Sequence, residues 1–308
     1  MRAVTYDAYA DDNSRLKLGE VPDPRVPPSS VLIEVRAAGV NPVDWKAMAG
    51  GLDPLLDTVF PVIPGWDVAG VVVRPGPDVP EFAAGDEVMA YARKDALQAG
   101  TFAQYVAVQA AHIALKPANL GWEQAGGLPL AGLTAQRVLD HLDVGEGDTV
   151  LVHAAAGGVG SLAVQIARAR GARVIGTASE KNHDYLRGLG AAPVAYGEGL
   201  AGRVRELAPD GVSAVADLAG GQLDATLAVL APGGRHASIA DPAVEEHGGH
   251  VVWVRPDGAK LALLADLAER GALDVEVAGS FPLAEVGAAF DLSRAGHTRG
   301  KLVIDPSA

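Results

Sequence analysis

The sequence contains no cysteine among its 308 residues. Disulfide frameworks, thiolate-ligated zinc, iron–sulfur clusters and cysteine nucleophiles are therefore excluded. Aromatic residues are scarce at 5% of the chain, so a group of them in one region becomes a candidate for stacking on a planar ligand. Neither a G-x-S-x-G elbow nor an H-E-x-x-H pairing occurs, which disfavours a hydrolase or a metalloprotease-like enzyme.

Positive charge is also in short supply. The chain has 25 Lys and Arg against 38 Asp and Glu, which gives a formal net charge of -13 and a pI near 5.0. A phosphate backbone requires a basic face, so nucleic acid is not an expected partner. No apolar run approaches the roughly twenty residues that cross a bilayer, which argues against a membrane partner. The start, Met1 to Asp7, lacks the apolar core of a secretory signal, and we expect a cytoplasmic protein.

The chain changes character twice along its length. Residues 1–118 carry short strands such as Val31–Ala37 and Val68–Val73, separated by proline and glycine turns. Residues 119–255 alternate strands and helices, and residues 256–308 mix both kinds of pattern. We therefore predict an α/β protein with a β-rich, barrel-like domain, a doubly wound parallel sheet, and a C-terminal return segment.

The alternating region contains strands and helices that can be assigned from the sequence pattern. The predicted elements are a helix at Trp122–Leu142, strands at Thr149–His153, Arg173–Ala178, Pro193–Tyr196, Ala214–Asp217, Arg235–Ile239 and His250–Val254, and helices at Ser161–Arg170, Lys181–Gly188 and Gln222–Leu230. In the tail we expect helices at Gly258–Arg270 and Leu283–Arg294 and a closing strand at Lys301–Asp305.

The first of these strands runs into small residues and glycines and then into an amphipathic helix. Such a turn is typical of a dinucleotide site, because the amides and the positive dipole end of the helix attract pyrophosphate. Gly157 lets the backbone approach the phosphates, and Gly160 lets the helix pack on the strand. Ala155 takes the place of the usual first glycine. The predicted cofactor-binding residues of the turn are Ala155, Gly157, Gly158, Val159 and Gly160.

The end of the next strand decides which dinucleotide we expect. An NAD site usually has an Asp or Glu about twenty residues beyond the turn, where it binds the ribose hydroxyls. The sequence instead offers the Ser179 hydroxyl and the Lys181 ammonium, with Glu180 between them. A hydroxyl and an ammonium suit a 2′-phosphate, so we predict NADPH. The alternative is that Lys181 is an ordinary solvated lysine at the start of a helix.

Seven motifs in order along the chain carry a family resemblance. They are Ala38-Gly39-Val40-Asn41-Pro42-Val43-Asp44, Pro64-Gly65-Trp66-Asp67-Val68-Ala69-Gly70, Gly85-Asp86-Glu87-Val88, Gly100-Thr101-Phe102-Ala103-Gln104-Tyr105-Val106, Gly132-Leu133-Thr134-Ala135, the glycine turn itself, and Gly300-Lys301-Leu302-Val303-Ile304. Together they resemble the medium-chain dehydrogenase/reductase superfamily over nearly the whole chain. Within it, the pattern is similar to the zinc-independent quinone oxidoreductases, the zeta-crystallin-like family, and to their enone-reducing relatives. The resemblance implies a GroES-like catalytic domain at 1–118, a Rossmann domain at 119–255, and completion of the first by 256–308.

The resemblance also implies that no catalytic zinc is bound. Asn41 stands where the zinc enzymes would have a cysteine, and Trp66 where they would have a histidine. An amide and an indole cannot replace a thiolate and an imidazole in a tetrahedral zinc shell. One weaker possibility for a cation is the polar loop that contains Glu245, Glu246, His247 and His250, although a glycine-rich loop of this kind is more simply solvated.

Without a metal, the protein must position the cofactor and stabilise charge on the acceptor oxygen. We expect Asn41, Asp44 and Thr134 to be catalytic: Asn41 near the acceptor oxygen or the nicotinamide ribose, Asp44 orienting a water or proton relay, and Thr134 facing the nicotinamide as its family counterpart does. Each has a structural alternative, as a turn asparagine, a helix cap and a helix threonine respectively. The predicted acceptor-pocket residues are Trp45, Trp66, Tyr91 and Phe102. Tyr91, Lys46 or solvent remain candidates for a proton donor.

Tyr196 at the end of the third strand resembles the family tyrosine beside the 2′-phosphate, and Arg299 in the return segment is a candidate to reach the same phosphate. The alternatives are a half-buried strand tyrosine and an exposed loop arginine. The predicted function is NADPH-dependent hydride transfer to a quinone. An NADPH-dependent enone or enal reductase and a catalytically silent NADPH-binding sensor are the alternatives. The apolar strand predicted at His250–Val254 suggests a homodimer that pairs through this sheet edge.

Overall fold

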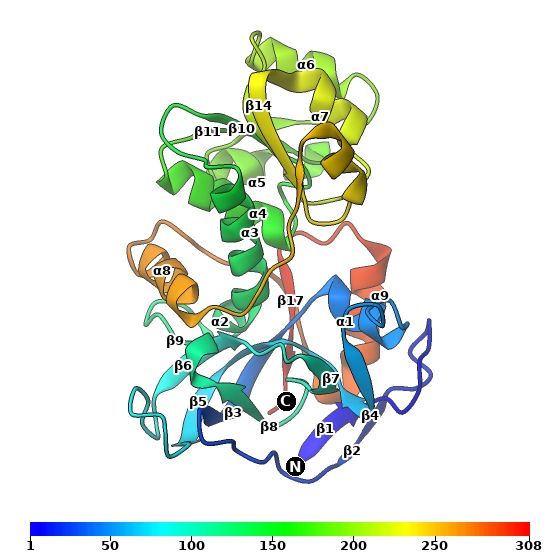
Figure 1. Cartoon of the computed structure of the whole chain (residues 1–308), viewed down its shortest axis with the longest axis vertical. Coiled ribbons are helices and arrows are strands. Elements are labelled where there is room, and N and C mark those ends of the chain that lie inside the picture. Colours follow the sequence, from blue (N-terminus) through cyan, green and yellow to red (C-terminus); the bar gives the residue numbers. More distant parts are fainter. The chain divides into compact units, whose positions relative to one another are not determined.

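The computed structural model describes residues 1–308, and the chain forms two compact units (Figure 1). The first, called the β-rich unit, comprises Met1–Leu130 and Arg255–Ala308, and the second, called the α/β unit, comprises Ala131–Val254. The domain boundary predicted at 118/119 lies before the boundary in the structure, which follows Leu130. Residues 119–130 belong to the β-rich unit because they pack on its sheet. No helix of the chain is both long enough and apolar enough to cross a bilayer.

The β-rich unit contains a seven-stranded sheet with the order β16-β17-β3-β5-β6-β9, in which β8 also pairs with β3, and two separate strand pairs, β1-β2 and β4-β7. Its strands are β1 (Arg2–Thr5), β2 (Lys17–Glu20), β3 (Ser30–Val40), β4 (Asp57–Ile63), β5 (Asp67–Pro75), β6 (Glu87–Tyr91), β7 (Ala96–Ala99), β8 (Tyr105–Gln109), β9 (Ile113–Leu115), β16 (Val277–Pro282) and β17 (Lys301–Asp305). Its α-helices are α1 (Pro42–Met48), α2 (Trp122–Gly127), α8 (Gly258–Glu269) and α9 (Val286–Ala295).

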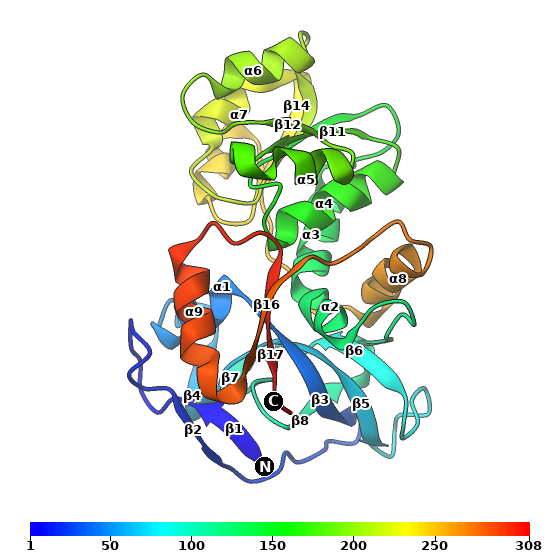
Figure 2. The same ribbon diagram turned by 180° about the vertical axis from the view of Figure 1, so that it is seen from behind.

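The central strand β3 shows why this sheet forms. Its alternate residues Val31, Ile33, Val35 and Ala37 are buried, as expected for a strand with one face on a core. Strand β17 returns from the C-terminus to pair antiparallel with β3, with Leu302 opposite Val40. Figure 2 shows β17 beside β16 and β3. The sequence did not reveal β16, which pairs parallel with β17.

Helix α2 lies tightly against β3 and β5. A Cβ atom on Gly39 would stand 2.6 Å from the carbonyl oxygen of Gly126, and a Cβ on Gly126 would stand 2.8 Å from the Cβ of Ala37. Only glycines allow the helix and strand backbones to come this close. The single helix predicted at Trp122–Leu142 is in fact two, α2 and α3 (Pro129–His141), because Pro129 cannot donate the backbone hydrogen bond that would continue α2.

The α/β unit contains a six-stranded sheet whose strands are all parallel and ordered β12-β11-β10-β13-β14-β15. Its strands are β10 (Thr149–Val152), β11 (Arg173–Thr177), β12 (Ala192–Val194), β13 (Val212–Asp217), β14 (Leu230–Ser238) and β15 (His250–Val251), and its further α-helices are α4 (Gly158–Ala169), α5 (His183–Gly188), α6 (Leu200–Leu207) and α7 (Leu223–Val229). Numbered along the chain, this order is 3-2-1-4-5-6, the arrangement of doubly wound dinucleotide-binding sheets. The predicted α/β fold class is confirmed.

Strand β15 is much shorter than the predicted strand His250–Val254. Only His250 and Val251 pair with β14, although the amide of Val252 still donates a hydrogen bond to the Ser238 carbonyl. Beyond this point the chain leaves the sheet, so the ladder that a longer edge strand would offer is nearly absent.

Candidate active site

The turn from β3 into α1 places two polar side chains in the interior of the β-rich unit. Asn41 leaves the strand in an extended conformation, and Pro42 then begins the helix, where its missing N–H is no loss. The backbone N–H of Asn41 donates a hydrogen bond of 2.7 Å to Oδ2 of Asp44. Asn41 is 2% exposed and Asp44 is 3% exposed, so both predicted catalytic side chains are removed from bulk water.

Two further side chains complete a buried polar cluster, which comprises Asn41, Asp44, Asp67 and Lys301. Asp67 at the start of β5 accepts hydrogen bonds from Nδ2 of Asn41 at 2.9 Å and from the backbone amide of Leu130 at 2.7 Å. Lys301, the first residue of β17, donates to the Val40 carbonyl at 3.0 Å and to Oδ1 of Asn41, and its Nζ lies 3.9 Å from Oδ2 of Asp67. Thus the Asn41 side chain bridges the ammonium and the carboxylate.

The charges of this cluster are governed by burial. Loss of water raises the pKa of Asp44 to about 8, although the hydrogen bond from the backbone N–H of Asn41 opposes the shift. Burial also raises the pKa of Asp67 to about 6, and the Lys301 ammonium and the side-chain amide of Asn41 limit this shift. Burial lowers the pKa of Lys301. Of the two carboxyl groups, Asp44 is therefore the one that holds a proton near neutral pH, and the Asp67 carboxylate is the one that faces the Lys301 ammonium.

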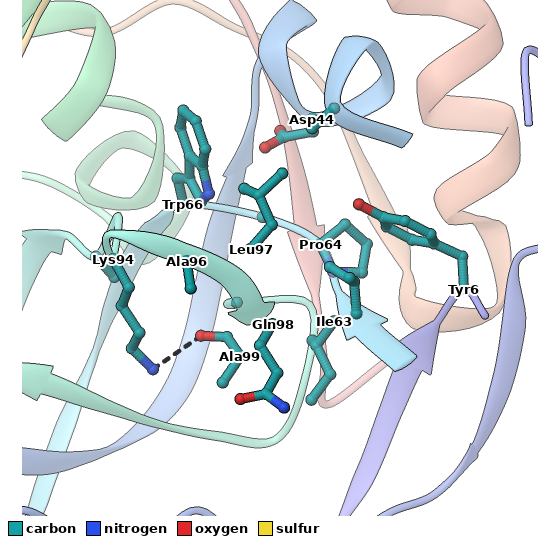
Figure 3. A pocket seen from close by; sticks show the side chains of 15 residues that line it. Tyr6, Asp44, Ile63, Pro64, Trp66, Lys94, Ala96, Leu97, Gln98 and Ala99 are labelled. Carbon is teal, nitrogen blue, oxygen red and sulfur yellow. Dashed lines mark hydrogen bonds between the residues drawn. The ribbon is translucent and has the colours of Figure 1, made fainter. Parts of the chain in front are cut away.

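Asp44 forms part of the wall of a pocket within the β-rich unit (Figure 3). The cavity is narrow, with a volume of about 20 Å³, which is close to the space that one water molecule needs. Its lining includes Tyr6, Asp44, Trp66, Lys94 and Leu97. Most of the lining residues are apolar, and Tyr6, Asp44 and Lys94 contribute polar groups to the wall.

The polar groups of this pocket differ in whether they are already bonded. Lys94 Nζ donates to the Ala99 carbonyl at 2.9 Å, and burial lowers the pKa of this lysine. Oδ1 of Asp44, by contrast, is buried and has no hydrogen-bond partner. Figure 3 shows the Asp44 carboxyl group directed toward the side formed by Trp66 and Leu97.

Of the four aromatic residues predicted for the acceptor pocket, only Trp66 lines this one. Tyr91 is fully buried behind it, with the two ring centroids 6.0 Å apart. Phe102 is also fully buried and packs on Phe290. Trp45 bonds through Nε1 to Ser293 at 3.1 Å and lies under Arg294. These three side chains therefore lie outside this pocket. Trp45 connects α1 to α9, and the rings of Tyr91 and Phe102 are part of the core.

The predicted glycine turn lies between β10 and α4, at the carboxyl end of a central strand. Gly157 caps α4 in an extended conformation. A Cβ on Gly160 would stand 2.1 Å from the carbonyl oxygen of Ala154. Ala155 is buried, and its amide donates to the Thr177 carbonyl at 2.9 Å, which joins the turn to the neighbouring strand. The first amides of α4, including those of Gly158 and Val159, have no preceding turn of helix to accept their hydrogen bonds, as an anion site requires.

The carboxyl ends of β11 and β12 bring the other predicted cofactor residues to one edge of the sheet. Thr177 pairs with Val194, so Ser179 and Tyr196 each follow their strand by two residues. Lys181 is exposed, and no ion pair occupies its ammonium. Tyr196 is 54% exposed. A basic, a hydroxylic and an aromatic side chain are thus available beside the strand that follows the glycine turn.

Two predicted residues are placed differently from this set. Arg299 lies in the β-rich unit, where its guanidinium forms an ion pair with Glu276 at 2.6 Å. Thr134 is buried within α3, in the α/β unit. In the polar loop with Glu245, Glu246, His247 and His250, no three potential metal-ligating side chains converge, and the His250 ring centroid lies 5.8 Å from that of His141.

The sequence analysis did not assign site roles to Asp67, Lys301 or Tyr6. A signal for Lys301 existed, because it is a lone charge ahead of the apolar run Leu302–Ile304 in a closing strand, and a buried lysine requires a partner. Asp67 likewise precedes the apolar residues of β5. Tyr6 offered no comparable signal, and only the pairing of its segment with Val62 brings it to the pocket.

Comparison with known proteins gives matches over both units. Residues 27–118 match the alcohol dehydrogenase GroES-like domain and residues 189–304 the zinc-binding dehydrogenase family. The chain is 36% identical to the chloroplastic NADPH-dependent alkenal/one oxidoreductase of Arabidopsis thaliana, over 99% of this chain and 80% of that protein. The solved quinone oxidoreductase of Coxiella burnetii is 33% identical with a TM-score of 0.85, and a structure described as an NAD-dependent alcohol dehydrogenase is 31% identical with a TM-score of 0.90, each over 99% of both chains.

Proposed function

This chain belongs to the medium-chain dehydrogenase/reductase superfamily, in its quinone oxidoreductase family, and we propose that it transfers a hydride from NADPH to a quinone. The observation that carries the proposal is the glycine turn at the carboxyl end of β10, in a sheet ordered for dinucleotide binding. The cofactor supplies the hydride, and the protein supplies binding, orientation and charge. The pocket in the β-rich unit supplies an apolar wall and a carboxyl group for the acceptor.

We propose NADPH over NADH because of the side chains that follow β11. No acid ends this strand, whereas Ser179 and the unpaired Lys181 ammonium stand there. Glu180, which is exposed, is the one opposing charge between them. A structure described as an NAD-dependent alcohol dehydrogenase is also similar to this chain, so the preference between NADPH and NADH is the property to measure.

The residues present do not fit a catalytic zinc. At the two motif positions where the zinc enzymes would have ligands stand Asn41, whose side chain bonds Asp67 and Lys301, and Trp66, an indole. The Lys301 ammonium lies 3.9 Å from Asp67, and a second, doubly charged cation in the same cluster would be strongly repelled. We therefore propose that the reaction needs no metal.

An enone or enal is the second candidate acceptor. Reduction of such a double bond adds a proton as well as a hydride, and the pocket presents a carboxyl group that is mostly protonated near neutral pH. The Arabidopsis thaliana relative is named for alkenals and alkenones. A quinone also takes up a proton on oxygen, so the same pocket serves both acceptors.

The direct test is consumption of reduced cofactor by metal-stripped protein. We expect NADPH to be oxidised when a small quinone or a simple enone is added, with much slower turnover of NADH. The acceptor that is reduced shows whether the protein is a quinone reductase or an enone reductase. Saturable NADPH binding without turnover of either acceptor would instead identify a cofactor-binding sensor.

The choice of cofactor is tested by Lys181→Ala. A charge-assisted hydrogen bond contributes about 1.5–3 kcal/mol, so loss of Lys181 should weaken NADPH binding by roughly ten- to a hundredfold and leave NADH binding nearly unchanged. Fluorescence titration of both cofactors measures this. Arg187→Ala is the matched control, since Arg187 is also an exposed cation, but it lies in the last turn of α5 and is paired with Asp184. Equal losses for the two cofactors in Lys181→Ala would remove the 2′-phosphate role.

We also propose that two copies pair through the edge of the six-stranded sheet. Support comes from the exposed Val251 in β15 and from Trp253 just beyond it, which are 39% and 43% exposed. Edge strands with apolar side chains are usually covered or paired. The short ladder of β15 makes these side chains, rather than a long run of backbone hydrogen bonds, the basis of the proposed homodimer.

A further inference from the structure

Oδ1 of Asp44 is the only buried carboxyl oxygen in the chain that lacks a hydrogen-bond partner. Buried polar atoms are almost always bonded, and an exception at the wall of a pocket indicates a group that a ligand completes. Oδ2 of the same carboxyl is occupied by the Asn41 amide at 2.7 Å. The two oxygens thus differ: Oδ2 fixes the side chain, whereas Oδ1 is left for a ligand at the pocket that Asp44 lines.

The neighbours of Asp44 explain where a proton resides. The cluster contains two buried carboxyls and one buried ammonium, so it is electrically neutral when one carboxyl is protonated. Asp67 has the ammonium of Lys301 and two hydrogen-bond donors, which stabilise its ionised form. Asp44 has one donor and a carboxylate as its neighbour, and it is therefore the carboxyl that keeps the proton.

We propose that Asp44 is the acid that protonates the acceptor through Oδ1, and that the Asp67–Lys301 pair and Asn41 are positioning residues that keep it protonated. This inference rests on the proposed reductase function. The acceptor gains two electrons and one hydrogen as hydride from the reduced nicotinamide. Its oxygen, or the α-carbon of an enone, then takes the proton as the Oδ1–H bond of Asp44 breaks. The Asp44 carboxylate regains a proton from water, so one hydride and one proton are consumed per turnover.

Several other titratable and charged groups lie near Asp44 and can influence how activity depends on pH. They are Tyr6 beside β1, Asp67 on β5, Tyr91 on β6, Lys94 before β7, Lys301 on β17, and Arg294 on α9 over the Trp45 ring. Burial raises the pKa of both tyrosines, and Lys94 already donates to the Ala99 carbonyl. Burial lowers the pKa of Lys94 and Lys301, and Asp44 is the carboxyl group that loses its proton as the pH rises through about 8.

The test is Asp44→Asn, which preserves an oxygen for the Asn41 amide and resembles the neutral acid in shape. General acid catalysis contributes about 10²–10⁴-fold, so kcat should fall by that factor while the affinity for NADPH stays unchanged. The wild type should lose activity as the pH rises through about 8, and this alkaline limb should be absent from the residual activity of the variant. Asp86→Asn is the control, because Asp86 also accepts a local backbone hydrogen bond, from Ala83, but lies outside the cluster.

Infrared spectroscopy gives a second readout, which requires no turnover and can be recorded on the wild-type protein. Infrared difference spectra of the unliganded wild type should show the C=O stretch of a protonated carboxylic acid at pH 7 that disappears as the pH rises through about 8. Asp44→Asn should lack this band and Asp86→Asn should keep it. Wild-type kcat in Asp44→Asn, or no such band, overturns the inference. Absence of turnover in the wild type would overturn the proposed reductase function instead, and the infrared band distinguishes the two failures.

Discussion

Replacing Lys301 with methionine should lower the free energy of unfolding at pH 7 by about 3–5 kcal/mol, the usual effect of removing one partner from a buried ion pair. The substitution removes the hydrogen bonds to the Val40 carbonyl and to Oδ1 of Asn41, and it leaves the Asp67 carboxylate without a cation. Lys301 is 5% exposed and Asp67 is fully buried, so water cannot take the place of the lost ammonium. Urea unfolding at pH 7 measures the loss.

The pH dependence gives the same prediction a second test. The folded-state pKa of Asp67 is already raised to about 6 from its ordinary value of 3.8, and loss of Lys301 should raise it further. A carboxyl with a raised pKa stabilises the fold at low pH and loses that contribution as the pH rises through the folded pKa. The deficit of Lys301→Met should therefore shrink between pH 7 and pH 5, as Asp67 takes up a proton.

Two companion variants identify the cause of this loss. Lys301→Met combined with Asp67→Asn should recover much of the stability at pH 7, because no buried charge then remains unpaired. Lys17→Met should change stability little, since Lys17 pairs with Asp7 at the exposed surface. If Lys301→Met were no more destabilising than Lys17→Met, the buried pair would not be ionic, and the reason for a protonated Asp44 would disappear.

The parts of the fold that the sequence predicted are those with a short-range pattern. Apolar runs and glycines identified β10, the turn at Gly157 and α4, and the alternation of strands and helices identified a parallel sheet, since each depends on neighbours within a few residues. The helix at Trp122–Leu142 was predicted as one because its apolar period continues past Pro129, although proline disfavours that continuation. Strand β16 was missed because it contains Gly279, Ser280 and Pro282, which are poor strand formers.

The buried cluster could not be assembled from the sequence, because its members are far apart in the chain. Asn41 and Asp44 stood in one motif, but Asp67 joins them through the pairing of β3 with β5, and Lys301 joins through the pairing of β17 with β3. Burial likewise separated the aromatic residues. Trp66 reaches a pocket, whereas Tyr91 and Phe102 are fully buried, and composition alone could not distinguish them.

A second large effect is expected at the glycine turn. Gly160→Ala would place a Cβ atom 2.1 Å from the Ala154 carbonyl oxygen and 2.7 Å from the Cα of Ala155. Both obstacles are backbone atoms, so the turn must open or α4 must move away from the end of β10. Overpacking of this kind destabilises by about 1–3 kcal/mol, occasionally more. Thermal unfolding should show this loss, and dinucleotide titration should show weaker binding, because the amides of α4 no longer point at the phosphates.

Two other glycines separate folding from binding in this prediction. Gly202→Ala in α6 meets nothing within 4 Å, so it should raise stability by about 0.4–1 kcal/mol and leave cofactor binding unchanged. Gly157→Ala meets only the Ala154 carbonyl at 3.3 Å, and its φ of -77° suits alanine, so the fold should persist while the added methyl group hinders the approach of a phosphate. Wild-type stability in Gly160→Ala would show that the turn can relax. Unchanged cofactor affinity in Gly157→Ala would show that the phosphates do not approach the backbone there, and the dinucleotide site would have to be sought elsewhere along the carboxyl edge of the sheet.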